Sequence, residues 1–160
     1  MSEGIAVDSN LFKKFEIQVY DPFSDFLKGT PEEYRFTISL LDVVRFAGHA
    51  CPAMIGAFLI SQRATDELFP TTKVCLRGAV RVEIPAPVEQ GATGPISNVF
   101  SFIFGAWDRS GFPGMQGRFV RRGLLSYDSP SVPQGMYRFS NLETGHAIDI
   151  GYDPSAVLIP

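Results

Sequence analysis

The chain has 160 residues, of which 45% are hydrophobic, and its formal net charge is −3. This length and hydrophobicity predict a single domain, residues 1–160, with a substantial core. The negative charge argues against a nucleic-acid partner held through its phosphates. No apolar run approaches the roughly 18 residues of a membrane span, so no membrane partner is expected.

The cysteine content and the N-terminal sequence predict a cytoplasmic protein. The chain has two cysteines, too few for the disulfide framework of a small secreted domain. Its first residues lack the charged and then apolar pattern of a signal peptide. A disulfide between Cys51 and Cys75 remains open, because pairing depends on geometry.

The first part of the chain predicts two short strands and then a helix. Residues 1–14 are expected to be loose. Apolar and polar residues alternate over 15–20 and again over 34–40, which is the period of a half-buried strand. Ser39 and Asp42 have capping-box spacing, so the second strand is expected to become a helix near Ser39 that ends at Gly48.

The segment that follows is Gly48-His49-Ala50-Cys51-Pro52. Pro52 suits the first position of a helix, because its missing N–H would be unpaired there. Cys51 is therefore predicted to be the N-cap, with the backbone N–H groups of Ala53 and Met54 directed at its sulfur. These groups and the helix dipole favour a thiolate.

A thiolate at Cys51 has two chemical uses, as a nucleophile and as a soft metal ligand. His49 adds a second ligand or a general base at the same place. These two residues are the candidate catalytic and metal-binding residues. The alternative is structural, since a free cysteine usually behaves as a small buried hydrophobe. Two ligands also fall short of the three or four of a zinc site.

The middle of the chain predicts two apolar helices and a strand. One helix begins at Pro52 and stops before Pro70, and the second begins at Pro95 and ends at Gly105. A strand is expected over 73–84, with an interruption at Gly78. Two such helices favour an α+β fold, in which they pack against one face of a mixed, largely antiparallel sheet.

Three arginines follow a glycine-rich loop over 107–117. In the strand predicted there, Arg118 and Arg122 share one face and Arg121 points to the other. Arginine forks suit a carboxylate or phosphate. Arg77, Arg118 and Arg122 are therefore candidate substrate-binding residues. A solvated strand face and a plain surface loop are the alternatives.

The C-terminal part, residues 128–160, predicts a loop, a β-hairpin and a tail. The hairpin strands flank residues 141–146, with the turn at Gly145. His146 is expected to be a surface residue, with a role as a ligand beside His49 as the minority alternative. The apolar end of the tail is expected to pack.

The GHACP segment and the apolar helix after it resemble the G-H-x-C-P segment of the FmdE-like family, which is named after a component of formylmethanofuran dehydrogenase. Further matching segments, which extend the resemblance over about residues 20–128, are Asp21-Pro22, residues 25–27, Arg77-Gly78, residues 91–94, Gly105-Ala106, Gly111-Phe112 and residues 118–125. The resemblance implies an α+β core like the catalytic domain of glyceraldehyde-3-phosphate dehydrogenase. It also implies a metal, usually taken as zinc, near His49 and Cys51.

The chain departs from that family at two places. Full-length members have a cysteine-rich zinc ribbon at the C-terminus, but no cysteine follows Cys75 here. Many members also have a cysteine before the second helix, where this chain has Thr93-Gly94-Pro95. A third ligand from that position is therefore missing, and the implied metal site is limited to His49 and Cys51.

Three functions follow as hypotheses. In the first, His49 and Cys51 bind zinc or another divalent transition metal that acts on a small anionic or carbonyl substrate. In the second, Cys51 is a metal-free nucleophile with His49 as its base, by analogy with the fold of the dehydrogenase. In the third, the domain is an accessory module for a redox enzyme. The apolar helices also suggest a homodimer.

Overall fold

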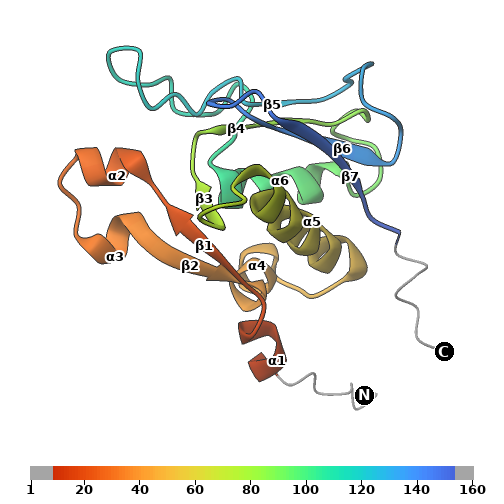
Figure 1. The fold of residues 1–160 in the computed structure, drawn as a ribbon. Helices are drawn as coiled ribbons and strands as arrows, with labels where there is room; N and C mark the ends of the chain where they lie inside the picture. Colours follow the sequence, from red (N-terminus) through yellow and green to blue (C-terminus); the bar gives the residue numbers. More distant parts are fainter. Residues whose placement is uncertain (1–8, 154–160) are drawn as a thin grey trace.

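The structure, a computed structural model, describes residues 9–153 (Figure 1). The predictions for residues 1–8 and for the tail after 153 lie outside the described residues. The helices are α1 (Ser9–Lys13), α2 (Pro22–Phe26), α3 (Pro31–Tyr34), α4 (Leu40–Ala47), α5 (Pro52–Leu68) and α6 (Thr93–Phe104). The strands are β1 (Glu16–Tyr20), β2 (Arg35–Ser39), β3 (Val74–Leu76), β4 (Val80–Glu83), β5 (Leu125–Ser126), β6 (Met136–Asn141) and β7 (Ala147–Gly151).

The strands form two sheets, in the orders β2-β1-β3 and β5-β4-β6-β7. In each sheet one pair is parallel, β1 with β3 and β4 with β5, and the other pairs are antiparallel. The α+β class and the mixed, largely antiparallel pairing are therefore confirmed. The prediction of a single sheet is wrong, because the chain turns at Gly78 (φ 85°) and passes from one sheet to the other.

Helix α5 occupies the centre of the molecule and contacts strands of both sheets and α6 (Figure 1). Its residues Met54, Ala57 and Phe58 are almost completely buried. On α6, the rings of Phe100 and Phe104 lie 5.1 and 5.4 Å from Phe139 of β6. The prediction of two apolar core helices is confirmed, and burial of these apolar side chains is the main source of stability.

The passage from β2 to α4 follows the sequence prediction. Ser39 is the N-cap, and Asp42 N donates to Ser39 Oγ (3.2 Å) while Ser39 N donates to Asp42 Oδ2 (2.8 Å). Both donors would otherwise be unpaired at the helix start. The terminal hairpin is also confirmed, as β6 and β7. Residues 9–13, predicted to be loose, form α1 instead.

Two other local predictions are wrong. Helix α6 begins at Thr93 rather than at Pro95, because the first helical turn has no partner for its N–H groups and tolerates proline. Residues 118–122 do not form a strand; Phe119 has a φ of 60°, outside the extended region, and only Leu125–Ser126 pair with β4. Arg118 and Arg122 therefore do not share a strand face.

Within residues 9–153, none of the helices combines the length and apolar character that crossing a bilayer requires.

Candidate functional site

His49 and Cys51 lie in the turn between α4 and α5. Helix α4 ends at Gly48, whose φ of 85° is a left-handed conformation that glycine adopts without strain. Cys51 is extended (φ −142°, ψ 167°) and is the N-cap of α5, and Pro52 takes the first helical position. The sequence prediction of a helix start at this cysteine is confirmed.

The predicted hydrogen bonds to the sulfur are absent. No backbone N–H group caps the helix through the side chain of Cys51. Sulfur is a weak acceptor, and cysteine is not among the residues that cap helices well. The half-buried thiol therefore makes no hydrogen bond with any group that the structure describes, and it is left available for a ligand.

Cys51 lines a cleft of about 460 Å³. The other lining residues come from α5, from the start of α6, from β6 and from the end of β7; they are Pro52, Ala53, Ala57, Ile60, Ala92, Ile96, Tyr137 and Tyr152. None of them carries a formal charge at neutral pH. The N-terminal ends of α5 and α6 both reach this cleft, because Cys51 and Ala92 are the two N-caps.

Two tyrosines form the polar part of the wall. The ring of Tyr152 lies directly on α5, so that a Cβ at Gly56 would stand 2.5 Å from its Cδ1 atom. Burial raises the pKa of Tyr137 above its usual value, so its hydroxyl stays protonated at neutral pH. The cleft therefore offers an apolar wall with two phenols and a thiol.

His49 is exposed, and its ring is oriented by the backbone. Its Nδ1 atom lies 3.3 Å from the carbonyl oxygen of Ala47. If Nδ1 carries the proton and donates it to that oxygen, Nε2 keeps its lone pair. Histidines that bind metals commonly have such a partner on the second nitrogen.

The donors fit part of a zinc shell but do not complete it. Thiolate and imidazole are both ligands that zinc prefers. Among residues 9–153, however, no group of three or more His, Cys, Asp or Glu side chains is placed to hold a metal. A site at His49 and Cys51 would therefore need further ligands of another kind or from elsewhere, and His49 is not among the residues that line the cleft.

The predicted substrate-binding arginines lie elsewhere, and none of the three lines the Cys51 cleft. Arg118 lies over the rings of Phe26 and Phe119, at 4.9 and 4.8 Å from their centroids. Arg122 is exposed, and its Nε donates to Gly111 O (3.3 Å). Arg77 belongs to a separate charged cluster.

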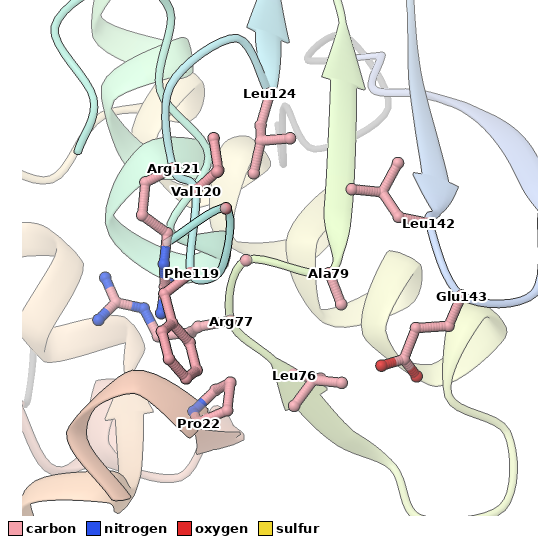
Figure 2. A pocket seen from close by; sticks show the side chains of 12 residues that line it. Pro22, Leu76, Arg77, Ala79, Phe119, Val120, Arg121, Leu124, Leu142 and Glu143 are labelled. Carbon is pink, nitrogen blue, oxygen red and sulfur yellow. The ribbon is translucent and has the colours of Figure 1, made fainter. Parts of the chain in front are cut away.

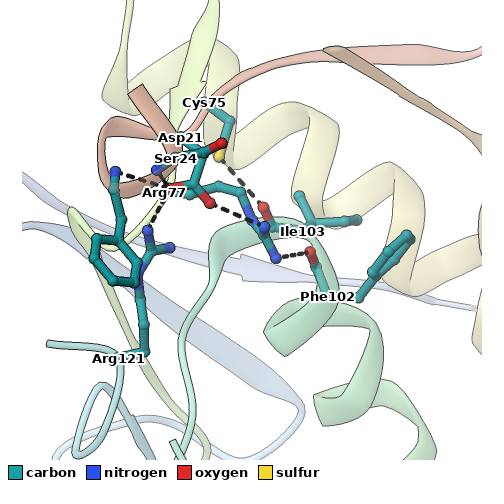
Figure 3. Close-up of polar contacts among 8 residues, drawn as sticks. Asp21, Ser24, Cys75, Arg77, Phe102, Ile103 and Arg121 are labelled. Atoms are coloured by element: carbon teal, nitrogen blue, oxygen red, sulfur yellow. Dashed lines mark hydrogen bonds and ion pairs between the residues drawn. The ribbon is translucent and has the colours of Figure 1, made fainter. Parts of the chain in front are cut away.

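That cluster consists of Asp21, Arg77 and Arg121 (Figure 3). Arg121 Nη2 donates to Asp21 Oδ1 (2.7 Å), and Arg77 Nη1 donates to Asp21 Oδ2 (3.2 Å). Arg77 Nη2 also donates to the carbonyl oxygen of Phe102 in the last turn of α6 (2.8 Å), where the helix dipole favours a cation. The cluster thus joins the start of α2, the end of β3, α6 and the 107–124 loop.

Arg121 is held in place by close packing as well as by charge. It is 7% exposed, and burial lowers the pKa of its guanidinium while Asp21 opposes this shift. The guanidinium lies against Gly78 and Gly105, and a methyl group at Gly105 would collide with Nη1. A residue at Gly105 (φ 63°) would also be strained. The arginine therefore has a structural role.

A second pocket, of about 310 Å³, borders this cluster. Figure 2 shows Arg77 and Arg121 on one side of it and Glu143 on the other. Its remaining wall is mostly apolar, with Leu124 and Leu142. Asp21 binds one nitrogen of each guanidinium, and Arg77 Nε is buried without a hydrogen-bond partner.

Neither Cys75 nor His146 lines the cleft at Cys51. Cys75 is completely buried on β3, its sulfur donates to Ile103 O (3.7 Å), and burial raises its pKa to about 12. Both cysteines are free, so the possible Cys51–Cys75 disulfide is not formed. His146 directly precedes β7 and is exposed, as predicted for a surface residue.

Sequence reasoning did not identify Asp21 as the partner of the arginines, nor Tyr137 and Tyr152 as neighbours of Cys51. Asp21 had one local signal, its position before Pro22, and it caps α2 by accepting from Phe23 N (3.0 Å). Its pairing with Arg121 spans 100 residues and depends on the tertiary fold.

In comparisons with family models, curated proteins and solved structures, no match to this chain was found.

Proposed function

We propose that the protein is an FmdE-like metal-binding domain of the cytoplasm. In this proposal Cys51 and His49 bind a divalent transition metal, in the first place zinc, and the site acts on a small carbonyl substrate. The observation that carries the proposal is the unbonded thiol of Cys51 at the helix start, facing a cleft, with His49 two residues earlier in the same turn.

The local geometry supports the choice of ligands. Cys51 is the N-cap of α5, and its side chain accepts no capping hydrogen bond, so the sulfur keeps its lone pairs for a ligand. In the tautomer whose Nδ1–H donates to Ala47 O, Nε2 of His49 is the atom that would coordinate. Gly48 gives the turn the left-handed conformation that it needs between the two helices.

The two donors leave coordination positions open, which is typical of a catalytic rather than a structural site. When bound, the metal would supply a Lewis acid that polarises a carbonyl. Cys51 gives up its proton on binding, and the cleft beside it excludes water from one side of the reacting group. Solvent, substrate or a residue of a second copy would complete the shell, which agrees with the expected homodimer.

Metal content tests the proposal directly. Anaerobically purified protein is expected to contain about one equivalent of metal per chain by mass spectrometry. Both Cys51→Ala and His49→Ala are expected to lose it. Substitution with cobalt should give a thiolate-to-metal charge-transfer band in the wild type that Cys51→Ala abolishes.

The chain provides a matched control for each ligand. Cys75→Ala and His146→Ala remove the other cysteine and the other histidine, and both variants should keep their metal. Substoichiometric metal that is unchanged in Cys51→Ala would refute the metal site.

A metal-free cysteine site is the second candidate. It is favoured by the lack of a third metal-binding side chain beside His49 and Cys51 among residues 9–153. Cys51 would then be the nucleophile and His49 its base. The rate of alkylation of Cys51 against pH distinguishes this candidate, since a thiol with an ordinary pKa of about 8.5 would count against it.

An accessory module without chemistry is the third candidate. Exposed apolar side chains on α2 and the 107–124 loop, namely Phe26, Leu27, Phe112, Met115 and Val120, would suit contact with a redox enzyme. Wild-type behaviour of a His49→Ala/Cys51→Ala double mutant in the host would favour this candidate over the other two.

A further inference from the structure

We infer that the cleft beside Cys51 binds the uncharged, apolar part of a small carbonyl compound, an alkyl or aryl group, with the carbonyl end at the thiol. The inference extends the proposed function, on which it rests for the chemistry at Cys51, and it names the class of substrate. It does not depend on a metal, because it concerns the residues that line the cleft.

The composition of the wall excludes a charged body. Apart from Cys51, the lining is made of aliphatic side chains and the two tyrosines, and it contains no lysine, arginine, histidine or carboxylate. Burying an unpaired charge against such a wall is strongly unfavourable. The volume, about 460 Å³, lies in the range of roughly 300–1,000 Å³ that is common for small-molecule sites.

The two helix N-termini that border the cleft suit a carbonyl oxygen. Cys51 and Ala92 are the N-caps of α5 and α6, and both line the cleft. The two helix N-termini therefore bring partial positive charge to the wall of the cleft. An oxygen that gains negative charge when a nucleophile or a metal acts on its carbon is stabilised there.

One side of the cleft is set by a pair of residues from distant parts of the chain. The ring of Tyr152 rests on Gly56, where any larger residue would push it away. Tyr137 adds a second ring from β6. These flat walls suit an extended alkyl chain or an aromatic ring.

Maleimides with N-substituents of increasing size provide the probe. Cys51 adds across their C=C bond, with the sulfur bonding to one carbon and a proton to the other, so that no leaving group or redox partner is needed. Second-order rates are measured for N-methyl-, N-butyl-, N-hexyl- and N-benzylmaleimide and for a maleimide with an N-carboxypentyl group. Mass spectrometry of the Cys51 peptide gives each rate, which is divided by the rate with glutathione.

The normalised rate is expected to rise about tenfold or more from the methyl to the hexyl compound, since burial of each CH₂ is worth up to about fourfold. The benzyl compound should also be fast, and the carboxypentyl compound should lose most of the gain. A flat series, or a faster rate for the charged compound, would overturn the inference.

Two variants locate the effect. Ala92→Trp fills the cleft from its exposed rim and should abolish the gain with chain length, measured as the ratio of the hexyl to the methyl rate within that variant. Val88→Trp is the matched control, because Val88 is exposed in the loop before α6 and does not line the cleft. Equal selectivity in the two variants would contradict the assignment to this cleft.

Further measurements test whether the chain itself fills the cleft, and they distinguish failure of this inference from failure of the proposed function. If selectivity appears only after removal of residues 154–160, or is lost as the protein dimerises, then the chain itself fills the cleft and the inference fails. All rates are measured after treatment with a chelator. If the maleimide rates rise with chain length but the purified protein contains no metal, the metal site is refuted and the substrate class stands. If the protein contains metal but the maleimide rates do not change with chain length, the substrate class is refuted and the metal site stands.

Discussion

The Cys51 turn and the Asp21 cluster use polar side chains in opposite ways. At Cys51 the thiol makes no hydrogen bond with the described residues and faces an apolar cleft. In the cluster, one carboxylate binds two guanidiniums, at 2.7 and 3.2 Å. Charges that pair with one another hold a structure together, whereas a thiol left without a partner is available to a ligand.

The two cysteines repeat this contrast within one residue type. Cys51 is half-buried at a helix start, and Cys75 is sealed inside the core on β3. Residue identity alone therefore does not distinguish a reactive thiol from a packing residue. The surroundings do, because they decide whether the thiolate can form and be reached.

The largest expected effect is the difference in reactivity between these thiols. Burial raises the pKa of Cys75 to about 12, which lowers its thiolate fraction about a thousandfold relative to an ordinary thiol. With iodoacetamide at pH 8, we expect Cys51 to be alkylated at least about a thousandfold faster, measured by mass spectrometry of the two peptides. Addition of urea, which exposes both, should bring the rates together. Similar rates in the folded protein would remove the distinction between the two sites.

The next effect is on stability, at the cluster. Arg121→Ala leaves Asp21 with only one of its two cations and opens a gap against Gly105. Removing one partner of a buried ion pair typically costs about 3–5 kcal/mol in the free energy of unfolding. Urea unfolding followed by the fluorescence of Trp107 measures this loss. Arg122→Ala, which removes an exposed arginine next in the chain, should change stability by less than about 0.5 kcal/mol, and an equal loss in both variants would contradict the structural role of Arg121.

The smallest effect is expected on the terminal hairpin, where Arg138 of β6 pairs with Asp149 of β7 (Nε to Oδ1, 2.8 Å). The hydrogen bond from Arg138 lowers the pKa of Asp149. The pair therefore stabilises the folded protein above the unfolded carboxyl pKa of about 3.9, and this contribution is lost as the pH falls through the lower folded value. Asp149→Asn should be slightly less stable than wild type at pH 7, and thermal unfolding should show the difference disappear in acid. A difference that persists at pH 2 would exclude the ion pair as its cause.

Local sequence signals predicted the elements around Cys51 well. Each helix boundary here is specified by one or two neighbouring residues. The start of α4 is specified by Ser39 with Asp42, its end by Gly48, and the start of α5 by Pro52. The strand predicted over residues 118–122 did not form. There the contacts of Phe119 with Phe23 and Phe26 (5.0 Å each) accompany a backbone with φ of 60°. Tertiary packing overrode the local pattern.

The grouping of the arginines shows the same limit. The sequence placed Arg118 with Arg122 because they are close in the chain, but the structure pairs Arg121 with Arg77 across a shared carboxylate. Arg77 and Arg121 meet because Gly78 and Gly105 leave room for the guanidinium. Such a meeting depends on where three distant segments cross.

The sequence by itself determined the α+β class, the two apolar helices, the capped entry into α4 and the position of Cys51 at a helix start, because each depends on short-range periodicity or on the backbone preferences of a few neighbouring residues. Only the tertiary structure decided that the strands form two sheets, that Asp21 takes both arginines, and that Tyr137 and Tyr152 enclose a cleft at the thiol. These features join residues far apart in the chain, and the packing of the whole core, which no local pattern encodes, brings them together.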